Sequence, residues 1–184
     1  MVKLLAFVLL IHIVVFSSLS YSATVFQDNS LSRRDTTIDP NKCIGFASNL
    51  PRSVTIVLIN QSGYNITYSQ VDFKDGRWIT QADTGNTITC DPSTYPPLPN
   101  GQSETFSTAN SRTAFGTEGT VFFGIGDQMA PPSTFSIYWL NPEIGVNNYI
   151  VTISNTSLYS YHNLDPGEGN NAVYQVIISA IPSA

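Results

Sequence analysis

Short strand-like runs separated by turn residues fill positions 116–153, and this pattern constrains the fold more than any other feature of the chain. The runs Thr120–Ile125, Phe135–Leu140 and Tyr149–Ile153 are rich in aromatic and β-branched residues, which favour extended backbone. Glycine and proline, which are typical of turns, occur in Gly116–Gly119 and Asn141–Asn148. The segment therefore predicts three strands joined through two demanding turns.

A similar pattern begins earlier in the chain. Ser53–Asn60 is strongly β-branched, and Asn65–Phe73 follows it after a short Gln-Ser-Gly turn. These two runs predict an opening hairpin, which a turn at Lys74–Arg77 connects to Trp78. The next segment, Thr80–Asn100, contains four prolines between Pro92 and Pro99, and we expect it to be a long loop that crosses between two sheets.

The whole pattern predicts an all-β fold. No segment of helical length places apolar residues at the spacing of an amphipathic helix without interruption by Gly, Pro or β-branched clusters. Eight or nine short strands with turn signals between them favour a two-sheet β-sandwich in a single domain. The remaining predicted strands are Ser103–Thr108, Leu158–Tyr161 and Ala172–Ser179.

The amino terminus has the pattern of a secretory signal. Lys3 precedes the apolar run Leu4–Phe16, and a small-x-small motif lies just before Ala23. The polar segment that follows contains Arg33-Arg34, which is either the cut site of a pro-segment or solvated charge in a linker. We therefore expect a secreted, extracellular protein with a signal peptide over residues 1–22, a linker or pro-segment over 23–40 and a β-sandwich domain over 41–184.

The two cysteines, Cys43 and Cys90, are the only thiols of a chain that the signal directs to an oxidising compartment. An even pair in such a setting favours a disulfide. Closing a loop of this length contributes about 4 kcal/mol in the chain-entropy model. A metal-binding or reactive pair is the competing interpretation, and it lacks a CxxC spacing and a nearby histidine.

Three N-glycosylation sequons begin at Asn60, Asn65 and Asn155. All three lie in segments predicted as turns, so we expect exposed positions that carry glycan in a glycosylating host. A turn that carries glycan does not dock against a partner, and the contact surface is expected elsewhere.

The order of these motifs resembles that of the aegerolysins and their bacterial crystal-protein relatives, which are small, acidic β-sandwich proteins of actinoporin-like fold. Aegerolysins recognise sphingolipid- or sterol-containing membranes, and some form pores only with a perforin-like partner. The resemblance thus implies membrane lipid as ligand and a second pore-forming protein as a possible partner. The signal peptide, the expected disulfide, the sequons and the Pro-rich insertion are departures that bear on cytolytic activity more than on fold. The resemblance rests on Asn60, Gly76-x-Trp78, Gly116-Thr-Glu-Gly119, Tyr138-Trp139, Asn141-Pro142 and Gly169-Asn-Asn171.

Aromatic residues are the expected contact residues. Trp and Tyr join a flat apolar ring to a polar tip, which suits bilayer interfaces and sugar faces alike. Trp78 is expected in the core, whereas strand alternation points one member of the Tyr138-Trp139 pair outward unless a loop covers it. We predict a lipid or ligand surface formed by Tyr138, Trp139, Asn141 and Tyr149.

The charge balance argues against a nucleic-acid partner. From residue 35 onward, five Lys or Arg and twelve Asp or Glu give a net charge of 5 − 12 = −7. Such a surface repels phosphate backbones, and it does not attract anionic membranes by charge alone.

Three function classes remain open: a lipid- or surface-binding module, a lectin-like carbohydrate-binding sandwich and a small secreted hydrolase. His162 is the only histidine after the signal, and there is no Gly-x-Ser-x-Gly elbow, so neither metal catalysis nor a Ser-His-Asp hydrolase is indicated. Paired carboxylates remain open for a glycosidase. We expect no catalytic residue, no metal and no cofactor, with a membrane lipid or a cell-surface glycan as the partner.

Overall fold

The computed structural model describes residues 40–83, 86–110, 115–126 and 133–182. The chain divides into two units, Met1–Asp35 and Thr36–Ala184. The first unit lies outside the described residues, and so do the predicted signal peptide and nearly all of the predicted linker.

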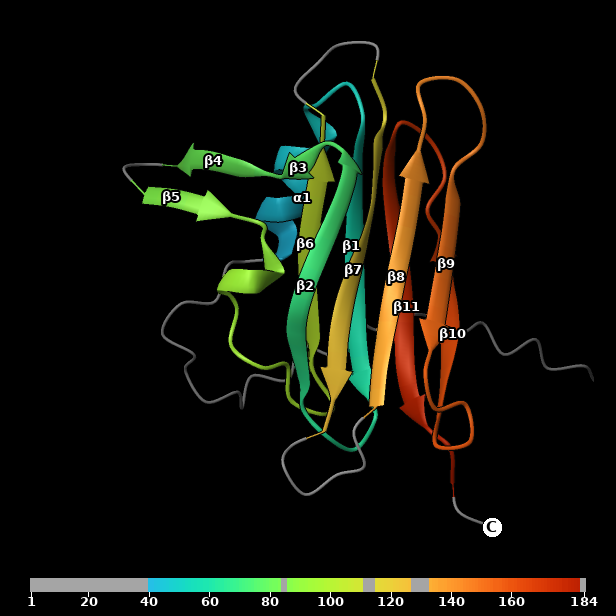
Figure 1. The fold of residues 1–184 in the computed structure, drawn as a ribbon. Helices are drawn as coiled ribbons and strands as arrows, with labels where there is room; N and C mark the ends of the chain where they lie inside the picture. Colours follow the sequence, from blue (N-terminus) through green and yellow to red (C-terminus); the bar gives the residue numbers. More distant parts are fainter. Residues whose placement is uncertain (1–39, 84–85, 111–114, 127–132, 183–184) are drawn as a thin grey trace, which may run out of the picture. The chain divides into compact units, whose positions relative to one another are not determined.

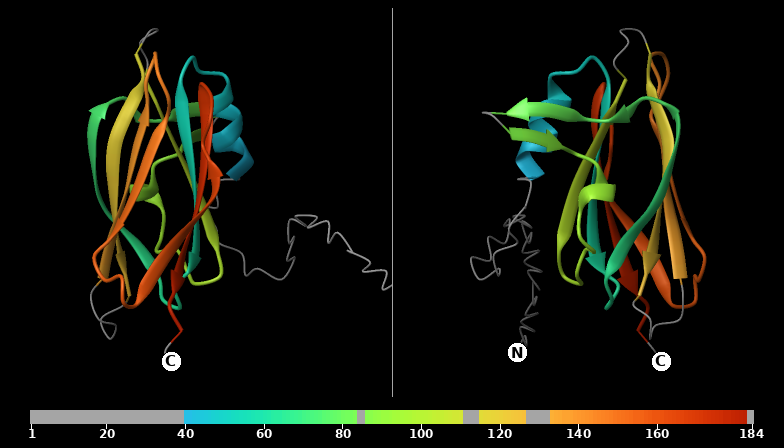
Figure 2. Two further views of the ribbon diagram at one scale, coloured as in Figure 1. Left: turned by 90° about the vertical axis from the view of Figure 1, so that its right-hand side faces the viewer. Right: turned by 60° about the vertical axis from the view of Figure 1, so that its left-hand side comes forward.

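Two facing β-sheets make up the second unit, which confirms the predicted all-β sandwich (Figures 1 and 2). One sheet has five strands in the order β10-β11-β1-β6-β3, and the other has four in the order β2-β7-β8-β9. A separate pair, β4-β5, extends to one side (Figure 1). The strand bounds are β1 Ser53–Gln61, β2 Ile66–Asp75, β3 Arg77–Trp78, β4 Thr80–Asp83, β5 Asn86–Thr89, β6 Ser103–Ala109, β7 Thr117–Ile125, β8 Ser133–Asn141, β9 Asn148–Ile153, β10 Tyr159–Pro166 and β11 Asn171–Ala180.

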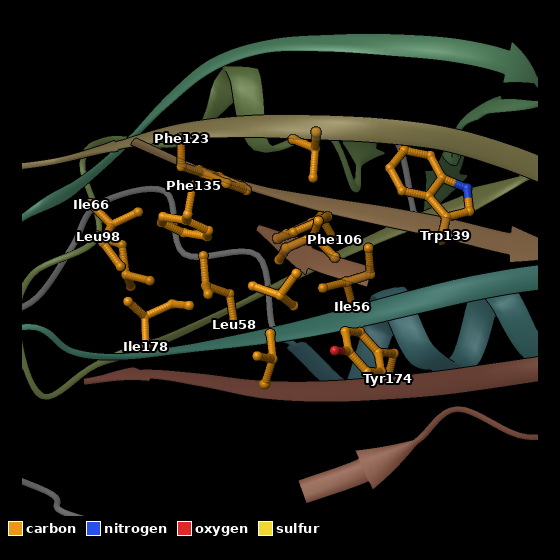
Figure 3. Packing of buried hydrophobic residues seen from close by; sticks show 14 of the residues in the cluster. Ile56, Leu58, Ile66, Leu98, Phe106, Phe123, Phe135, Trp139, Tyr174 and Ile178 are labelled. Atoms are coloured by element: carbon orange, nitrogen blue, oxygen red, sulfur yellow. The ribbon is translucent and has the colours of Figure 1, made fainter. Parts of the chain in front are cut away.

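The core fills the space between the two sheets. Strand alternation sends every second side chain inward, so that Ile56 and Leu58 of β1 meet Phe135 of β8 and Phe106 of β6 (Figure 3). Trp78 is buried in this core, as predicted, and its ring lies 5.7 Å from that of Trp139.

The predicted opening hairpin is wrong. β1 pairs in parallel with β11 and antiparallel with β6, whereas β2 pairs with β7 in the opposite sheet. The short connection after Gln61 therefore carries the chain from one sheet to the other. Alternation of apolar and polar residues shows that a strand buries one face. It does not show which strand is the hydrogen-bonded neighbour, because the same face can be buried in either sheet.

An irregularity in β2 determines which of its side chains face the core. Its register with β7 shifts between Tyr68 and Gln70. Because an extra residue moves the following side chains to the other face, Val71 and Phe73 pack against the same core as Ile66 and Tyr68.

The Gly116–Gly119 turn is also corrected, because β7 already begins at Thr117. The glycine at 119 serves close packing instead. An added Cβ there would lie 2.6 Å from Cζ2 of Trp139 and 2.9 Å from the carbonyl oxygen of Asp72. Any side chain at this position would displace the indole from its place between the sheets.

Thr80–Asn100 is more ordered than the predicted loop, and the prediction that it crosses between the two sheets is wrong, because β3 before it and β6 after it pair with each other in the five-stranded sheet. It forms the β4-β5 pair, a 3₁₀ turn at Pro92–Thr94, and a strap whose Leu98 exchanges backbone hydrogen bonds with Ile66, N to O distances 2.9 and 2.7 Å. This strap covers part of the edge of β2. Prolines donate no backbone hydrogen bond, and Leu98 lies between Pro97 and Pro99, so the sequence did not indicate its pairing with Ile66.

Helix α1, Pro40–Ser48, is the one α-helix among the described residues, and the sequence did not predict it. It lies on the outer face of the five-stranded sheet (Figure 2), and Cys43 joins it to Cys90 through the predicted disulfide. Nine residues are too few for an independently stable helix, so packing and the disulfide hold it in place. No helix among the described residues is both long enough and apolar enough to cross a bilayer.

The three sequons differ in the state of their asparagines. Asn60 has 0% exposure, and its Nδ2 donates to the carbonyl oxygens of Tyr64 at 2.7 Å and Leu98 at 2.8 Å. The expectation of an exposed turn is therefore wrong for Asn60. Asn65 is exposed and Asn155 is half-buried, and neither Nδ2 makes a hydrogen bond to a described residue.

In a glycosylating host, the folded protein is expected to carry glycan at Asn65 and Asn155 and none at Asn60, because a glycan would replace one of the two N–H donors of Nδ2 and the Asn60 side chain is fully buried. Asn65→Gln and Asn155→Gln should each remove one glycan from the intact mass of the secreted protein. Recovery of a glycopeptide modified at Asn60 from folded protein would refute the assignment.

Candidate functional site

The four residues predicted as a contact surface do not lie on one surface. Trp139 has 0% exposure, and its Nε1 donates to Oγ1 of Thr117 at 3.3 Å within the core. Asn141 is also fully buried. Neither side chain reaches a ligand from these positions, which corrects the prediction for both.

Tyr138 points outward from the four-stranded sheet, as alternation requires when Trp139 points inward. Its hydroxyl donates to Oε1 of Glu118 at 2.9 Å, and Nζ of Lys74 lies 5.6 Å from the ring centroid. Lys74 and Glu118 form an ion pair at 2.8 Å. The hydrogen bond from Lys74 lowers the pKa of Glu118. Tyr138 is therefore a half-buried residue on a polar face of the sheet.

Tyr149 supports a loop rather than presenting its ring to solvent. It stacks on Tyr174 with ring centroids 4.4 Å apart, and its hydroxyl donates to the carbonyl oxygen of Gly167 at 3.0 Å. Burial raises the pKa of Tyr149, and the nearby Asp165 adds to this effect. The hydrogen bond from the Tyr149 hydroxyl to Gly167 holds the β10-β11 loop.

The predicted turn between Asn141 and Asn148 is present, as the loop that joins β8 to β9. At its tip, Ile144 is 88% exposed and Val146 is 86% exposed. Gly145 separates them with φ of 121°, a backbone conformation that favours glycine. Two aliphatic side chains thus project from one loop into solvent, where they contribute nothing to the core.

Asn141 anchors this loop to two other segments. Its Nδ2 donates to the carbonyl oxygens of Ser53 and Asn170, both at 2.9 Å, and its Oδ1 accepts from Nη1 of Arg52 at 3.1 Å. Nη2 of Arg52 donates to the carbonyl oxygen of Glu143. The start of β1, the β8-β9 loop and the β10-β11 loop are therefore held together by one buried amide.

A cavity of about 370 Å³, called here the loop cavity, lies between these three segments. Asn147 joins two of its walls, since its Nδ2 donates to the carbonyl oxygens of Gly167 at 2.8 Å and Gly169 at 2.9 Å. Arg52 and Glu168 bring charge to the lining. The cavity is lined by Arg52, Gly145, Val146, Asn147, Pro166, Gly167, Glu168, Gly169 and Asn170.

The sequence analysis predicts the loop but not the side chains that the loop exposes. The predicted contact surface consists mainly of aromatic residues and does not include Ile144 or Val146. Aliphatic residues inside an Asn-, Pro- and Gly-rich turn are themselves a signal of exposure. The sequence gives no signal for Arg52 beyond its positive charge. Its position directly before a strand that starts beside Asn141 became visible only in the folded chain.

No protein-family model matches the chain, and no curated protein matches it in sequence. Solved structures that share its fold include the following three. IP-1A from Alcaligenes faecalis is 19% identical with a TM-score of 0.52, over 73% of this chain and 93% of that one. RahU protein, solved with a TRIS molecule, is 13% identical with a TM-score of 0.51, over 76% and 99%.

The third structure is the lipid binding protein Nakanori, which is 13% identical with a TM-score of 0.52, over 78% of this chain and 79% of that one. At these identities the likeness shows the fold alone. It agrees with the β-sandwich that the resemblance to aegerolysins implies, and it does not establish family membership.

Proposed function

We propose that this chain is an exported protein that binds membrane lipids through the end of the sandwich that carries the β8-β9 loop. The observation that carries the proposal is the exposure of Ile144 and Val146 at the tip of that loop. Transfer of aliphatic side chains from water into a bilayer interface lowers the free energy. The loop backbone that carries them is already fixed by the contacts of Asn141, which reduces the entropy cost of binding.

The positions of the sequons support this orientation. β1 runs from Arg52 toward the turn that holds Asn65, and β9 runs from the β8-β9 loop toward Asn155. Both glycan-competent asparagines therefore lie at the end opposite the loop, where Figure 1 shows the β1-β2 and β9-β10 turns. Glycans at that end leave the proposed membrane-facing end free.

The charge of the chain shapes the expected binding. Full burial of an aliphatic side chain contributes about 1.5–3 kcal/mol, so the two tip residues provide a moderate anchor. A net charge of −7 from residue 35 onward supplies no general attraction to anionic lipid. Binding should therefore depend only weakly on salt.

The fold likeness to a lipid binding protein agrees with the proposal, as does the disulfide, which suits an oxidising compartment. We expect no membrane lysis by this chain alone, since Thr24–Pro40 has no apolar face of the kind an inserting helix needs. A cytolytic role would require the second pore-forming protein that the resemblance implies.

Co-sedimentation of the mature protein with vesicles tests the proposal, using neutral, sphingolipid-rich and sterol-rich mixtures at low and high salt. We expect binding to at least one mixture with little loss at high salt, and no dye release. Absence of binding to every mixture, together with binding on a glycan array, would favour the lectin alternative. Polysaccharide hydrolysis by the purified protein would instead favour the hydrolase.

A further inference from the structure

Strands β9 and β10 are the outermost strands of their sheets, on the same side of the sandwich. β9 ends the order β2-β7-β8-β9, and β10 begins the order β10-β11-β1-β6-β3. The two strands contact each other, and Figure 1 shows them next to one another. Each therefore has one backbone edge that pairs with no strand among the described residues. The sequence of β9 contains neither a charged residue nor a proline, which are among the usual protections of such an edge.

A cavity of about 430 Å³, called here the edge cavity, lies between β9, β10 and the turn that joins them. Its buried lining residues, which are apolar or aromatic, are Val151, Ile153 and Tyr159. Three exposed residues with hydroxyl groups also line it, and so does Tyr161, which is 47% exposed. None of the described lining residues is charged. This combination suits a neutral ligand with an apolar face and many hydroxyl groups, such as a saccharide.

A predicted glycosylation site lies directly beside the edge cavity. Thr156 lines the cavity and is the middle residue of the sequon Asn155-Thr-Ser157. Oγ of Ser157 donates to Oδ1 of Asn155 at 2.7 Å, while Nδ2 of Asn155, the atom that carries an N-glycan, makes no hydrogen bond to a described residue. Asn65 differs, because neither it nor its chain neighbours line this cavity. A glycan on Asn155 thus begins next to a surface that suits a sugar.

Covalent attachment compensates for weak recognition. Contact of a sugar with one tyrosine ring, together with a few hydrogen bonds at a solvated surface, gives only modest affinity. A short link raises the effective concentration of a tethered group to the order of millimolar. The glycan of the same chain therefore has an advantage over free saccharides that are present at lower concentrations.

We propose that the edge cavity holds the first sugar of a glycan on Asn155, an N-acetylglucosamine, with its apolar face against Tyr161. The chain's own glycan then covers the unpaired edge of β9 and prevents edge-to-edge association of two copies. This inference depends on the glycosylation of Asn155 that the sequon predicts. It goes beyond membrane binding, which the proposed function places at the other end of the sandwich.

Hydrogen exchange at the backbone amides of β9 tests the inference in protein secreted from a glycosylating host. Exchange should be slow in the wild type and about tenfold faster in Asn155→Gln. Ser157→Ala removes the sequon but keeps Asn155, and it should show the same increase. Ser157→Thr retains the sequon and should exchange like the wild type. Asn65→Gln, which removes the other predicted glycan, is the matched control and should leave β9 exchange unchanged.

Two further samples identify the sugar and the side chain that make the contact. Enzymatic trimming of the glycan to a single N-acetylglucosamine should leave β9 exchange slow. Tyr161→Ser keeps the sequon and should exchange like Asn155→Gln. Because Tyr161 is exposed, this variant should unfold at nearly the same denaturant concentration as the wild type.

Loss of the glycan should also change the oligomeric state. Asn155→Gln should self-associate as its concentration is raised, whereas the wild type and Asn65→Gln should stay monomeric in analytical ultracentrifugation. An Asn155→Gln variant that remains monomeric throughout would contradict the protection of the β9 edge.

Two results would overturn the site itself. One is the absence of glycan from Asn155 in the secreted wild type, even if soluble chitobiose slowed β9 exchange, because the proposed occupant is the attached glycan. The other is equal β9 exchange in the wild type, Asn155→Gln and Tyr161→Ser. Neither result bears on vesicle binding by the β8-β9 loop, so the two proposals fail separately.

Discussion

Trp139→Ala is expected to lower the free energy of unfolding by about 3–5 kcal/mol, the usual cost of removing a large aromatic side chain from a core. The indole is fully buried, packs 5.7 Å from the rings of Phe73 and Trp78, and donates to Thr117. Figure 3 shows it between the two sheets. Equilibrium denaturation measured by circular dichroism would give the loss.

Tyr138→Ala is the matched control, one residue away on the outer face of the same strand. It removes the hydrogen bond to Glu118 and the contact with Lys74, both at a partly solvated surface, so its cost should be about 1 kcal/mol or less. Equal losses for the two variants would contradict the assignment of faces in β8. Because Trp139 is structural, its replacement is not a test of lipid contact.

The double variant Ile144→Ser, Val146→Ser is expected to reduce vesicle affinity by about 100-fold or more, since two aliphatic side chains each worth about 1.5–3 kcal/mol on full burial no longer enter the interface. Its unfolding free energy should match that of the wild type, because both side chains are exposed. Co-sedimentation over a range of lipid concentrations gives the affinity.

The control for this variant removes apolar surface from the opposite end of the sandwich. Tyr64 and Leu158 are both partly exposed there, in the turns after β1 and β9. Tyr64→Ser combined with Leu158→Ser should bind vesicles like the wild type. A similar loss of affinity in both double variants would show that general hydrophobicity, and not the β8-β9 loop, governs binding.

The sequence predicted strands better than their partners. Local alternation located β1, β6 and β11 to within a few residues, because each buries one face against a common core. It did not predict that β1 and β11 pair in parallel, since that contact joins residues far apart in the chain. The bulge after Tyr68 likewise depends on the register with β7 and leaves no local pattern.

The sequence pattern predicts Gly119 as a turn residue, whereas the structure places it in strand β7. Gly119 is needed because Trp139 and Asp72 leave no room for a Cβ at this position, a constraint that arises only after β2, β7 and β8 have assembled. Gly145 does lie in a turn, with the positive φ that the sequence pattern implied. Sequence alone does not distinguish a glycine required for φ from one required for space.

The sequence predicted the loop of the candidate site but not which of its side chains are exposed. The Asn141–Asn148 segment was identified from its turn residues, but its aromatic neighbours proved to be supports. Tyr149 holds the β10-β11 loop through Gly167, and Asn141 holds three segments together. Which side chains remain for a ligand depended on burial, and that left Ile144, Val146 and Arg52.

The most direct test of the proposed function is to locate the end of the sandwich that meets the membrane. An environment-sensitive fluorophore is attached at Val146→Cys in the β8-β9 loop or at Asn65→Cys in the β1-β2 turn, and vesicles containing lipid-borne quencher are added. The label at 146 should shift to shorter wavelength and be quenched, while the label at 65 should not change. Quenching at 65 with none at 146, or no change at either position in the presence of binding, would contradict membrane contact through the β8-β9 loop.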